Sequence, residues 1–416
     1  MSDSSDRADD FRMTPLELRA SLWLASLYGS RMLGMFLILP VFAVHAAGMP
    51  GGESAAMVGL AFGIYGLTQA VFQIPFGAAS DRFGRKPVIT AGLLLMLAGS
   101  LVAAAADTLT GLTLGRALQG AGAVSAAISA LLADTTRDSQ RTKAMAMVGA
   151  MIGLSFAFSL VAAPLLYRAI SLSGIFLVTG VLAVAGIAIV WWLIPTPALA
   201  PAAARVRMPL HKLMDADMMR LNFGIFVLHL TQMALFVVVP GRLVELAGLP
   251  LAEHWKLYLP VVVASFAVMM PPLNWAERNG RLRGLFLAAI GLQFLSQLGF
   301  ALVPPGLASV AIMLLLFFIG FNMLEALIPS LVTRLAPAEG RGLAMGVYST
   351  AQALGLFCGG ALGGLLSQHL GGASVFVVAA LLLALWALVA LGARRWPLRH
   401  GAGVGGVTPS HTPTAS

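Results

Sequence analysis

Long runs of apolar residues recur along the whole chain and are separated by short polar segments. Stretches such as 88–106, 285–302 and 375–393 are apolar on every helical face, whereas a strand of a membrane barrel would alternate polar and apolar residues. An α-helix needs about 20 mainly apolar residues to cross the hydrocarbon core of a bilayer. The pattern therefore predicts an all-α membrane protein.

Twelve runs are long enough to be membrane spans, with boundaries defined to within a few residues. They cover residues 18–46, 55–78, 88–106, 110–133, 142–166, 173–194, 220–246, 253–275, 285–303, 306–333, 343–368 and 372–393. The Pro-rich interval between the sixth and seventh runs is typical of a linker. We therefore predict a cytoplasmic N-terminal segment (1–17), a six-helix bundle (18–194), a cytoplasmic linker (195–219), a second bundle (220–393) and a disordered cytoplasmic tail (394–416).

The two halves of the chain match each other at nearly constant offsets. Residues 35–40 correspond to 235–240, residues 141–145 to 341–345, and residues 81–85 to 277–281, at offsets of 200, 200 and 196. Separate matches in register indicate an internal duplication. The sequence therefore predicts two pseudo-symmetric bundles.

Composition and charge agree with a membrane location. Of the 416 residues, 59% are hydrophobic and 10% are charged, which is more apolar surface than a soluble domain could bury. The net charge of +9 would also suit a nucleic-acid-binding protein. With the N-terminus in the cytoplasm, however, 21 of the 26 Lys and Arg residues fall in inner segments and are spread over all of them. This distribution predicts cytoplasmic termini and no nucleic-acid partner.

The chain carries little of the chemistry that enzymes use. Its one cysteine, Cys358, lies in an apolar run, so no disulfide, metal site or redox site is expected. The first ten residues are acidic and polar, unlike a signal peptide. No inner loop has the phosphate-binding pattern G-x-x-x-x-G-K-[ST], so ATP hydrolysis is not indicated and we expect no cofactor.

The loop between the second and third spans carries a compact charge cluster with glycines on both sides. Its residues are Gly77, Asp81, Arg82, Gly84, Arg85 and Lys86. The first glycine would let helices approach closely, and the second would permit a tight turn. Asp134 ends the fourth span at the same face, where it could pair with Arg85. We predict that this set latches one state of a moving bundle; the alternative is that the charges only mark topology.

The run from Gly77 to Lys86 resembles the loop signature G-x-x-x-D-R-x-G-R-K of the major facilitator superfamily. Segments 30–36, 63–77, 115–120, 253–256 and 345–350 resemble a bacterial inner-membrane branch of it, over all twelve spans. The resemblance implies the superfamily fold, membrane transport, a bacterial inner-membrane location and a network around Asp81 that holds the outward-facing state. Two features differ: that branch carries a soluble domain after the last span, and drug/proton antiporters have Gly-Pro where this chain has Ala163-Pro164.

Charged side chains inside a membrane span are costly and usually functional. Three lie well inside the predicted spans, away from the span ends, namely Arg31, Arg116 and Glu325. A carboxyl group in an apolar cavity can gain or lose its proton near neutral pH, so Glu325 is the first candidate for proton coupling. The alternative is a permanent structural ion pair with Arg31.

Three other residues are candidates for proton coupling, namely Arg31, Arg116 and His229. Arg116 lies in Gly115-Arg116-x-x-Gln119-Gly120, which resembles a superfamily motif implicated in proton transfer. Because arginine stays protonated, it would tune a neighbouring group or bind an anion, unless the motif serves packing alone. His229 could relay protons, and the alternative is a hydrogen-bonded structural histidine.

Polar side chains recur at helical spacing within the spans. They are Tyr65, Gln69 and Gln73 on the second span, Gln119 on the fourth, Gln232 on the seventh, Asn322 on the tenth, and Tyr348 and Gln352 on the eleventh. We expect them to line a substrate cavity, although hydrogen bonds between helices would use the same residues. Glycines at 355, 359, 360, 363 and 364 on the eleventh span indicate close helix packing, or sliding during gating.

Taken with the resemblance, these patterns predict a secondary active transporter of a small organic solute that works by alternating access, is proton-coupled and exports its substrate. We expect a monomer whose partners are the substrate, protons and the lipid bilayer. The alternatives are uncoupled or symport uptake, and a membrane sensor or scaffold that does not transport. The identity of the substrate cannot be derived from these residue types.

Overall fold

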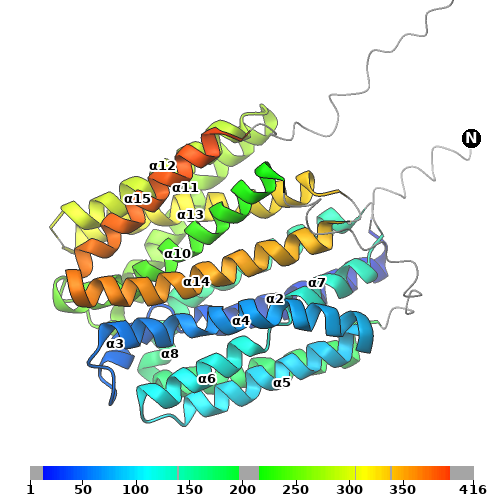
Figure 1. Ribbon diagram of the computed structural model, residues 1–416, viewed down its shortest axis with the longest axis horizontal. Helices are drawn as coiled ribbons and strands as arrows, with labels where there is room; N and C mark the ends of the chain where they lie inside the picture. The colour runs from blue at the N-terminus through cyan, green and yellow to red at the C-terminus, as the bar shows by residue number, and fades with distance from the viewer. Residues whose placement is uncertain (1–12, 138–139, 196–214, 305, 338–339, 394–416) are drawn as a thin grey trace, which may run out of the picture.

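The computed structural model describes residues 13–137, 140–195, 215–304, 306–337 and 340–393, and these residues form helices and no strands (Figure 1). The first half contains α2 (Pro15–Phe36), α3 (Phe42–Ala47), α4 (Ala55–Phe83), α5 (Arg85–Ala104), α6 (Leu109–Ala121), α7 (Ser125–Asp134), α8 (Arg141–Ala188) and the π-helical η1 (Ile189–Leu193). The second half contains α10 (Ala216–Glu245), η3 (Leu251–Glu253), α11 (Trp255–Arg278), α12 (Leu282–Leu302), α13 (Leu307–Leu335), α14 (Arg341–Leu370) and α15 (Gly372–Leu391). The predicted all-α fold is confirmed.

Ten helical segments in the described part of the chain are long and apolar enough to cross a membrane. One of them, Lys143–Leu193, is 51 residues long and corresponds to the fifth and sixth predicted spans. The first predicted span consists of α2 and α3 and is not among the ten; α2 carries three charged residues, Glu17, Arg19 and Arg31. Counted in this way, the described helices account for the twelve predicted spans.

The long helix α8 folds back on itself at Ser171. A Cβ added to Gly29 of α2 would lie 3.1 Å from Met151, and one added to Gly186 would lie 2.8 Å from Leu27 of α2, so both arms of α8 run beside α2. Ser171 has a φ of 59° and a ψ of −176°, outside the helical region. Gly371, 200 residues later, separates α14 from α15 with a φ of 80° and a ψ of 159°. The duplicated halves thus turn at equivalent positions, and glycine adopts that backbone more easily than serine does.

Two of the predicted spans are interrupted within the membrane-spanning length. The predicted span 110–133 breaks at residues 122–124, between α6 and α7. A Cβ on Gly122 would lie 2.3 Å from the carbonyl oxygen of Gly92, so the chain passes close to the α5 backbone at this break. The predicted span 18–46 is interrupted by the turn at residues 37–41, which contains Pro40. Each of these two spans is therefore built from two helices.

The two halves meet along a seam between α4 and α14, which lie side by side in Figure 1. A Cβ on Gly59 would lie 2.3 Å from the carbonyl oxygen of Gly360, and one on Gly63 would lie 2.6 Å from that of Phe357. At the end of the seam the Gln368 side-chain oxygen accepts hydrogen bonds from Ser54 Oγ at 2.8 Å and from Ala56 N at 2.9 Å. We call this end the Ser54 face and the opposite end the Gly84 face; the halves are closed against each other at the Ser54 face.

Several predicted segments lie wholly or mostly outside the described residues. They are the N-terminal segment up to residue 12, the linker from 196 to 214 and the tail from 394 to 416. The domain limits at 18–194 and 220–393 therefore stay predictions. The first helix after the linker begins at Ala216, where the Asp215 side chain accepts a hydrogen bond from Met218 N at 2.8 Å.

Candidate functional site

A histidine, a carboxyl group and an amide meet inside the second half. They belong to His229 on α10, Glu325 on α13 and Gln352 on α14. His229 Nε2 lies 2.8 Å from Gln352 Nε2 and 3.7 Å from Glu325 Oε2. His229 is fully buried, and the Glu325 side chain is 17% exposed. The only acid predicted inside a span is thus placed next to the only histidine that was predicted as a proton relay.

The hydrogen bonds of His229 define its protonation state. Nδ1 faces the carbonyl oxygen of Ile225 at 3.2 Å, which can only accept, so Nδ1 carries the hydrogen. Nε2 then keeps its lone pair and accepts from the Gln352 amide. Glu325 Oε2 has no hydrogen-bond partner among the described residues, although it lies within ion-pair distance of Nε2. Two groups therefore compete for one ring nitrogen.

The other predicted polar residues of the second half are also buried. Asn322, one turn before Glu325, donates to Ser265 Oγ on α11 at 3.2 Å. Neither side-chain polar atom of Gln232 has a hydrogen-bond partner within the described residues. Tyr348 on α14 is 5% exposed. These side chains therefore belong to the interior of the second half.

In the first half, the stripe on α4 is buried along its whole length. Tyr65, Gln69 and Gln73 are 2%, 1% and 1% exposed. The Tyr65 hydroxyl, Gln69 Oε1 and both polar atoms of Gln73 lack a hydrogen-bond partner among the described residues. Buried polar atoms are nearly always bonded in native proteins, so unpartnered ones mark places where water or a ligand binds. The structure thus leaves both predicted roles of this stripe open.

The two buried arginines of the first half differ in their surroundings. Arg116 donates to Gln119 Oε1 at 3.1 Å and to the Phe62 carbonyl oxygen at 3.3 Å, and Gln119 in turn donates to Ser100 at 2.9 Å. Arg31 donates from Nη1 to Ser125 Oγ at 2.9 Å, and its Nη2 has no partner among the described residues. The ion pair of Arg31 with Glu325, our alternative for that acid, is not present.

Aromatic rings join the halves beside the cluster. Phe156 on α8 contacts Phe318 and Phe321 on α13, with ring centroids 5.8 and 5.3 Å apart. Phe321 in turn lies edge-on to His229, at 5.7 Å between centroids. The polar cluster is therefore bordered by an apolar wall to which both halves contribute.

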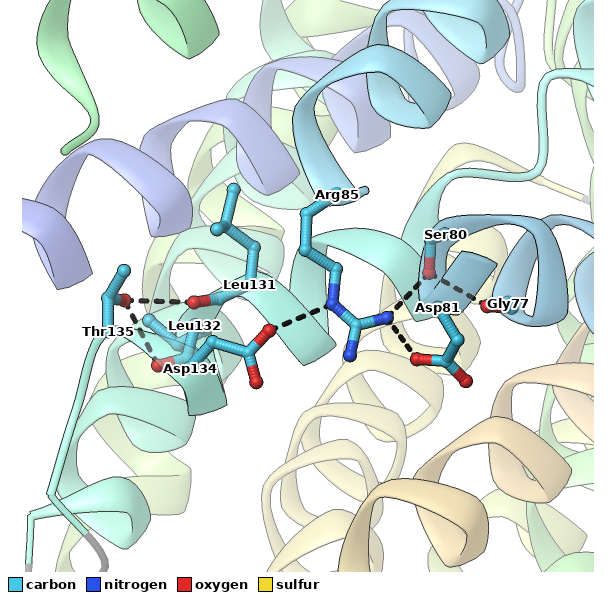
Figure 2. Close-up of polar contacts among 8 residues, drawn as sticks. All are labelled: Gly77, Ser80, Asp81, Arg85, Leu131, Leu132, Asp134 and Thr135. Carbon is cyan, nitrogen blue, oxygen red and sulfur yellow. Dashed lines mark hydrogen bonds and ion pairs between the residues drawn. The ribbon is translucent and has the colours of Figure 1, made fainter. Parts of the chain in front are cut away.

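At the Gly84 face, Arg85 lies between two carboxylates, as Figure 2 shows. Its Nε donates to Asp134 Oδ2 at 2.9 Å, and its Nη1 donates to Asp81 and, at 2.7 Å, to Ser80 Oγ. Gly84, with a φ of 95°, ends α4 and lets α5 begin at Arg85. The predicted ion pair of Arg85 with Asp134 is present, and it links the ends of α4, α5 and α7.

Three residues of the predicted latch have no hydrogen bond to Arg85 among the described residues, although the Gly77 carbonyl oxygen accepts from Ser80 Oγ at 2.8 Å (Figure 2). Lys86 is buried and donates to the carbonyl oxygen of Ile194 at 2.7 Å, which ties α5 to the end of η1. Arg82 is exposed and its guanidinium lies over the ring of Phe83, 5.2 Å from the centroid. A Cβ added to Gly77 would be in ordinary contact with Ala126 at 3.6 Å, so the close helix approach that we predicted there was wrong.

A second ion pair lies at the Gly84 face, and sequence reasoning did not find it. Glu17 forms a capping box with Thr14 at the start of α2 and accepts hydrogen bonds from Arg137 Nε and N, both at 2.9 Å. The Arg137 side chain lowers the pKa of Glu17 from 4.5 to about 2. The start of α2 is thereby tied to the loop that follows α7.

Replacing Glu17 with glutamine is expected to destabilise the protein at pH 7 by about 1 to 3 kcal/mol, because hydrogen bonds to a charged group contribute about this much and Arg137 is partly exposed. Since the folded pKa of about 2 is below the unfolded value, the contribution is complete above about pH 4.5 and declines as the pH falls towards 2. Differential scanning fluorimetry in detergent should give a constant gap in unfolding temperature from about pH 7.5 to 5.5, which narrows below 4.5. A gap that widens on acidification, or an equal loss in the exposed-loop control Asp107→Asn, would contradict this account.

Some contacts at the site involve residues that the sequence did not single out. Ser125 and Ser265 are the partners of Arg31 and Asn322, and no local pattern marks a serine for such a role. The seam was detectable in part, because Gly59 and Gly63 have the small-xxx-small spacing that favours close helix packing. We interpreted other glycines in that way, but not Gly59 or Gly63.

Comparison with known proteins gives consistent matches. A sequence profile described as Major Facilitator Superfamily matches residues 24–331 and 221–410. The Inner membrane transport protein YajR of Escherichia coli (strain K12) is 42% identical over 386 residues, which cover 92% of this chain and 85% of that protein. The Multidrug resistance protein MdtH of Shigella boydii serotype 4 (strain Sb227) is 30% identical and covers 83% of each chain. The human organic anion transporter MFSD10 (TETRAN) has a similar fold, with a TM-score of 0.69 at 17% identity over 91% of this chain and 100% of that one.

Proposed function

The chain belongs to the Major Facilitator Superfamily, whose members are membrane transporters, and on that premise we propose that it is a proton-coupled exporter of a small organic solute. It would act as a monomer in the inner membrane of a bacterium, with both termini in the cytoplasm. The basic residues of the inner loops support this orientation, which makes the Gly84 face cytoplasmic and the Ser54 face periplasmic. The name of the relative MdtH, a multidrug resistance protein, supports export.

The observation that carries proton coupling is the competition of Gln352 and Glu325 for His229 Nε2. In the neutral imidazole, Nε2 accepts from Gln352 and thereby links α10 to α14. A proton transferred from Glu325 to Nε2 turns that atom into a donor, so it can bond to Glu325 and can no longer accept from Gln352. A single proton transfer therefore exchanges a link between α10 and α14 for a link between α10 and α13.

The same exchange lies next to the contact between the halves. Gln352 precedes Ala353, whose carbonyl oxygen would be 2.4 Å from a Cβ on Gly66 of α4. A change in how α14 is held by α10 therefore acts directly on the α4–α14 seam. In alternating access the seam must open to expose the site to the Ser54 face, so this adjacency gives a physical route from proton transfer to gating.

The test compares wild-type protein with Glu325→Gln in proteoliposomes under an imposed pH gradient. Solutes come from a panel of anions, cations and neutral molecules, and an internal pH dye reports proton movement with each. Glutamine resembles the protonated carboxyl group but cannot release a proton, so gradient-driven transport should fall by about tenfold or more while solute exchange across the membrane is retained. Glu253→Gln, at the end of η3 and outside the cluster, is the control and should behave as wild type.

Each alternative predicts a different result. Equal gradient-driven transport by wild type and Glu325→Gln would contradict coupling through Glu325. Downhill movement of solute without proton flux would indicate a facilitator, and inward movement with protons would indicate symport. No movement of any panel solute, with binding retained, would favour a sensor or scaffold.

A further inference from the structure

Within the described residues, the interior of the first half carries two positive charges without acidic partners. Arg31 and Arg116 are 2% and 1% exposed, and neither forms an ion pair with an acidic residue among the described residues. The described acids of this half lie at helix ends or in loops, namely Glu17, Glu53, Asp81, Asp107 and Asp134. Charged groups buried in membrane spans are normally paired with an opposite charge. Two guanidinium groups without such a partner therefore favour the binding of an anion beside them.

Arg31 is the less satisfied of the two. Arg116 makes two hydrogen bonds within the first half, its Nε is unpartnered within the described chain, and its guanidinium lies 4.8 Å from the ring centroid of Tyr65. Arg31 makes one hydrogen bond, to Ser125, and its Nη2 is buried and unpartnered within the described chain. A planar guanidinium with a free edge is suited to the two oxygens of a carboxylate or a similar oxyanion.

A second feature that attracts anions lies beside Arg31. It is the start of helix α7, which follows the break in the fourth span. Helix α7 has ten residues and begins at Ser125, the residue that Arg31 contacts. Its N-cap residue, Val124, makes no side-chain capping bond, so the first backbone N–H groups of α7 are not satisfied in that way. The start of a helix carries partial positive charge, and the half-helices of transporters use it to hold anionic groups.

This corner of the first half faces the rest of the cluster. Arg31 lies 6.0 Å from the ring centroid of Tyr65, whose hydroxyl is unpartnered within the described residues. Phe36, on the same helix as Arg31, lies edge-on to Phe156 of α8, with ring centroids 5.1 Å apart. Phe156 of the first half contributes to the aromatic wall next to Glu325. An anionic group at Arg31 would therefore have an apolar surface within the same central region.

We propose that Arg31, together with Ser125 at the uncapped start of α7, binds an anionic oxyacid group of the transported solute, and that the rings around Phe156 contact its apolar body. This rests on the proposed transport function and adds the chemical class of the substrate, an amphiphilic organic anion. Arg116 has a separate role as a structural residue of the first half.

The test measures unfolding temperatures of the purified protein with a panel of carboxylates that have aromatic or branched alkyl bodies, each paired with its amide and its amine. For the wild type, carboxylates near a hundred times their Kd should raise the apparent Tm by about 2 °C or more, while their amides and amines should not. Arg31→Gln should lose this preference. Arg242→Gln should keep it, since Arg242 lies outside the cluster and donates to the carbonyl oxygen of Phe300.

Conservative variants show whether a loss of carboxylate binding results from misfolding. Arg31→Lys keeps the charge without the planar fork, and Ser125→Ala removes the hydroxyl group, so each should weaken carboxylate binding by about tenfold while the preference for anions remains. A monodisperse elution profile and a single unfolding transition are required of every variant. The proposal is overturned if amides or amines stabilise the wild type as strongly as carboxylates, if no carboxylate of the panel does so, or if Arg31→Gln keeps the preference.

Failure of this inference can be distinguished from failure of the proposed function. Carboxylates that bind through Arg31 in a protein without gradient-driven transport would leave the inference standing and remove the transport proposal. Proton-coupled transport that depends on Glu325 but favours cations or neutral solutes would do the reverse. Glu325→Gln should still bind carboxylates as wild type does, because the anion contacts are in the first half.

Discussion

Replacing Gly63 with leucine is expected to abolish net transport, because the closed seam between α4 and α14 has no space for a side chain there. Even a Cβ at this position would lie 2.6 Å from the carbonyl oxygen of Phe357, and backbone atoms cannot move aside as a flexible side chain can. A cost of about 3 kcal/mol to the closed arrangement lowers its population by about a hundredfold. The variant should therefore fold but remain open at the Ser54 face.

Closure of the seam can be measured by cross-linking two cysteines introduced on its opposite sides. Since Cys358 is the only cysteine, a Cys358→Ser background permits Ser54→Cys and Gln368→Cys to be introduced as a pair across the seam. A short bifunctional thiol reagent should join the pair in the otherwise unchanged protein and stop transport. With Gly63→Leu added, both the cross-link and transport should be lost.

A matched glycine serves as the control for this prediction. Gly291 of α12 is also helical, and no heavy atom lies within 4 Å of a Cβ added to it, so Gly291→Leu should transport as wild type does. If Gly63→Leu supports normal transport and cross-links normally, the seam is not the gate at the Ser54 face. If both leucine variants fail equally, the loss reflects general damage to membrane helices.

The length and apolarity of the spans were readable from the sequence because a bilayer imposes both. The reversal between the fifth and sixth spans was placed between residues 166 and 173, but nothing marked Ser171, since serine rarely adopts the backbone that glycine adopts at Gly371. The break at 122–124 was missed for a different reason. Its apolar residues continue the pattern of a span, and only the contact of Gly122 with Gly92 reveals why the helix stops.

The candidate site was predictable as a set of residues and not as a set of contacts. The cost of charge in a membrane singled out Arg31, which is buried, and Glu325, which is 17% exposed, and an ion pair between them was one of two roles considered for Glu325. In the structure Glu325 approaches His229, whereas Arg31 contacts Ser125. The partner of each charged side chain depends on how helices far apart in the sequence pack together. The residue pattern of a single sequence does not specify that packing.

Replacing Arg85 with alanine is expected to reduce transport by about tenfold or more. Arg85 holds Asp134, Asp81 and Ser80 together at the Gly84 face with hydrogen bonds to all three, and its side chain is 11% exposed. Its removal leaves two carboxylates near each other without a bridging cation, which destabilises the arrangement of α4, α5 and α7 that we propose as a latch. Proteoliposome transport measures the loss, and labelling of cysteines introduced at the Gly84 face reports which state accumulates.

Arg82 provides a control that distinguishes two roles of this loop. The loop could act as a conformational latch, or its basic residues could only orient the chain in the membrane. It belongs to the same loop and carries the same charge, but it is exposed and its guanidinium lies over Phe83. If the loop matters only because it is basic, Arg82→Ala and Arg85→Ala should lower transport and membrane insertion equally. If Arg85 acts through its partners, Arg82→Ala should be near wild type, and the exchange Arg85→Asp with Asp134→Arg should recover part of the activity lost in either single variant, because it restores that ion pair.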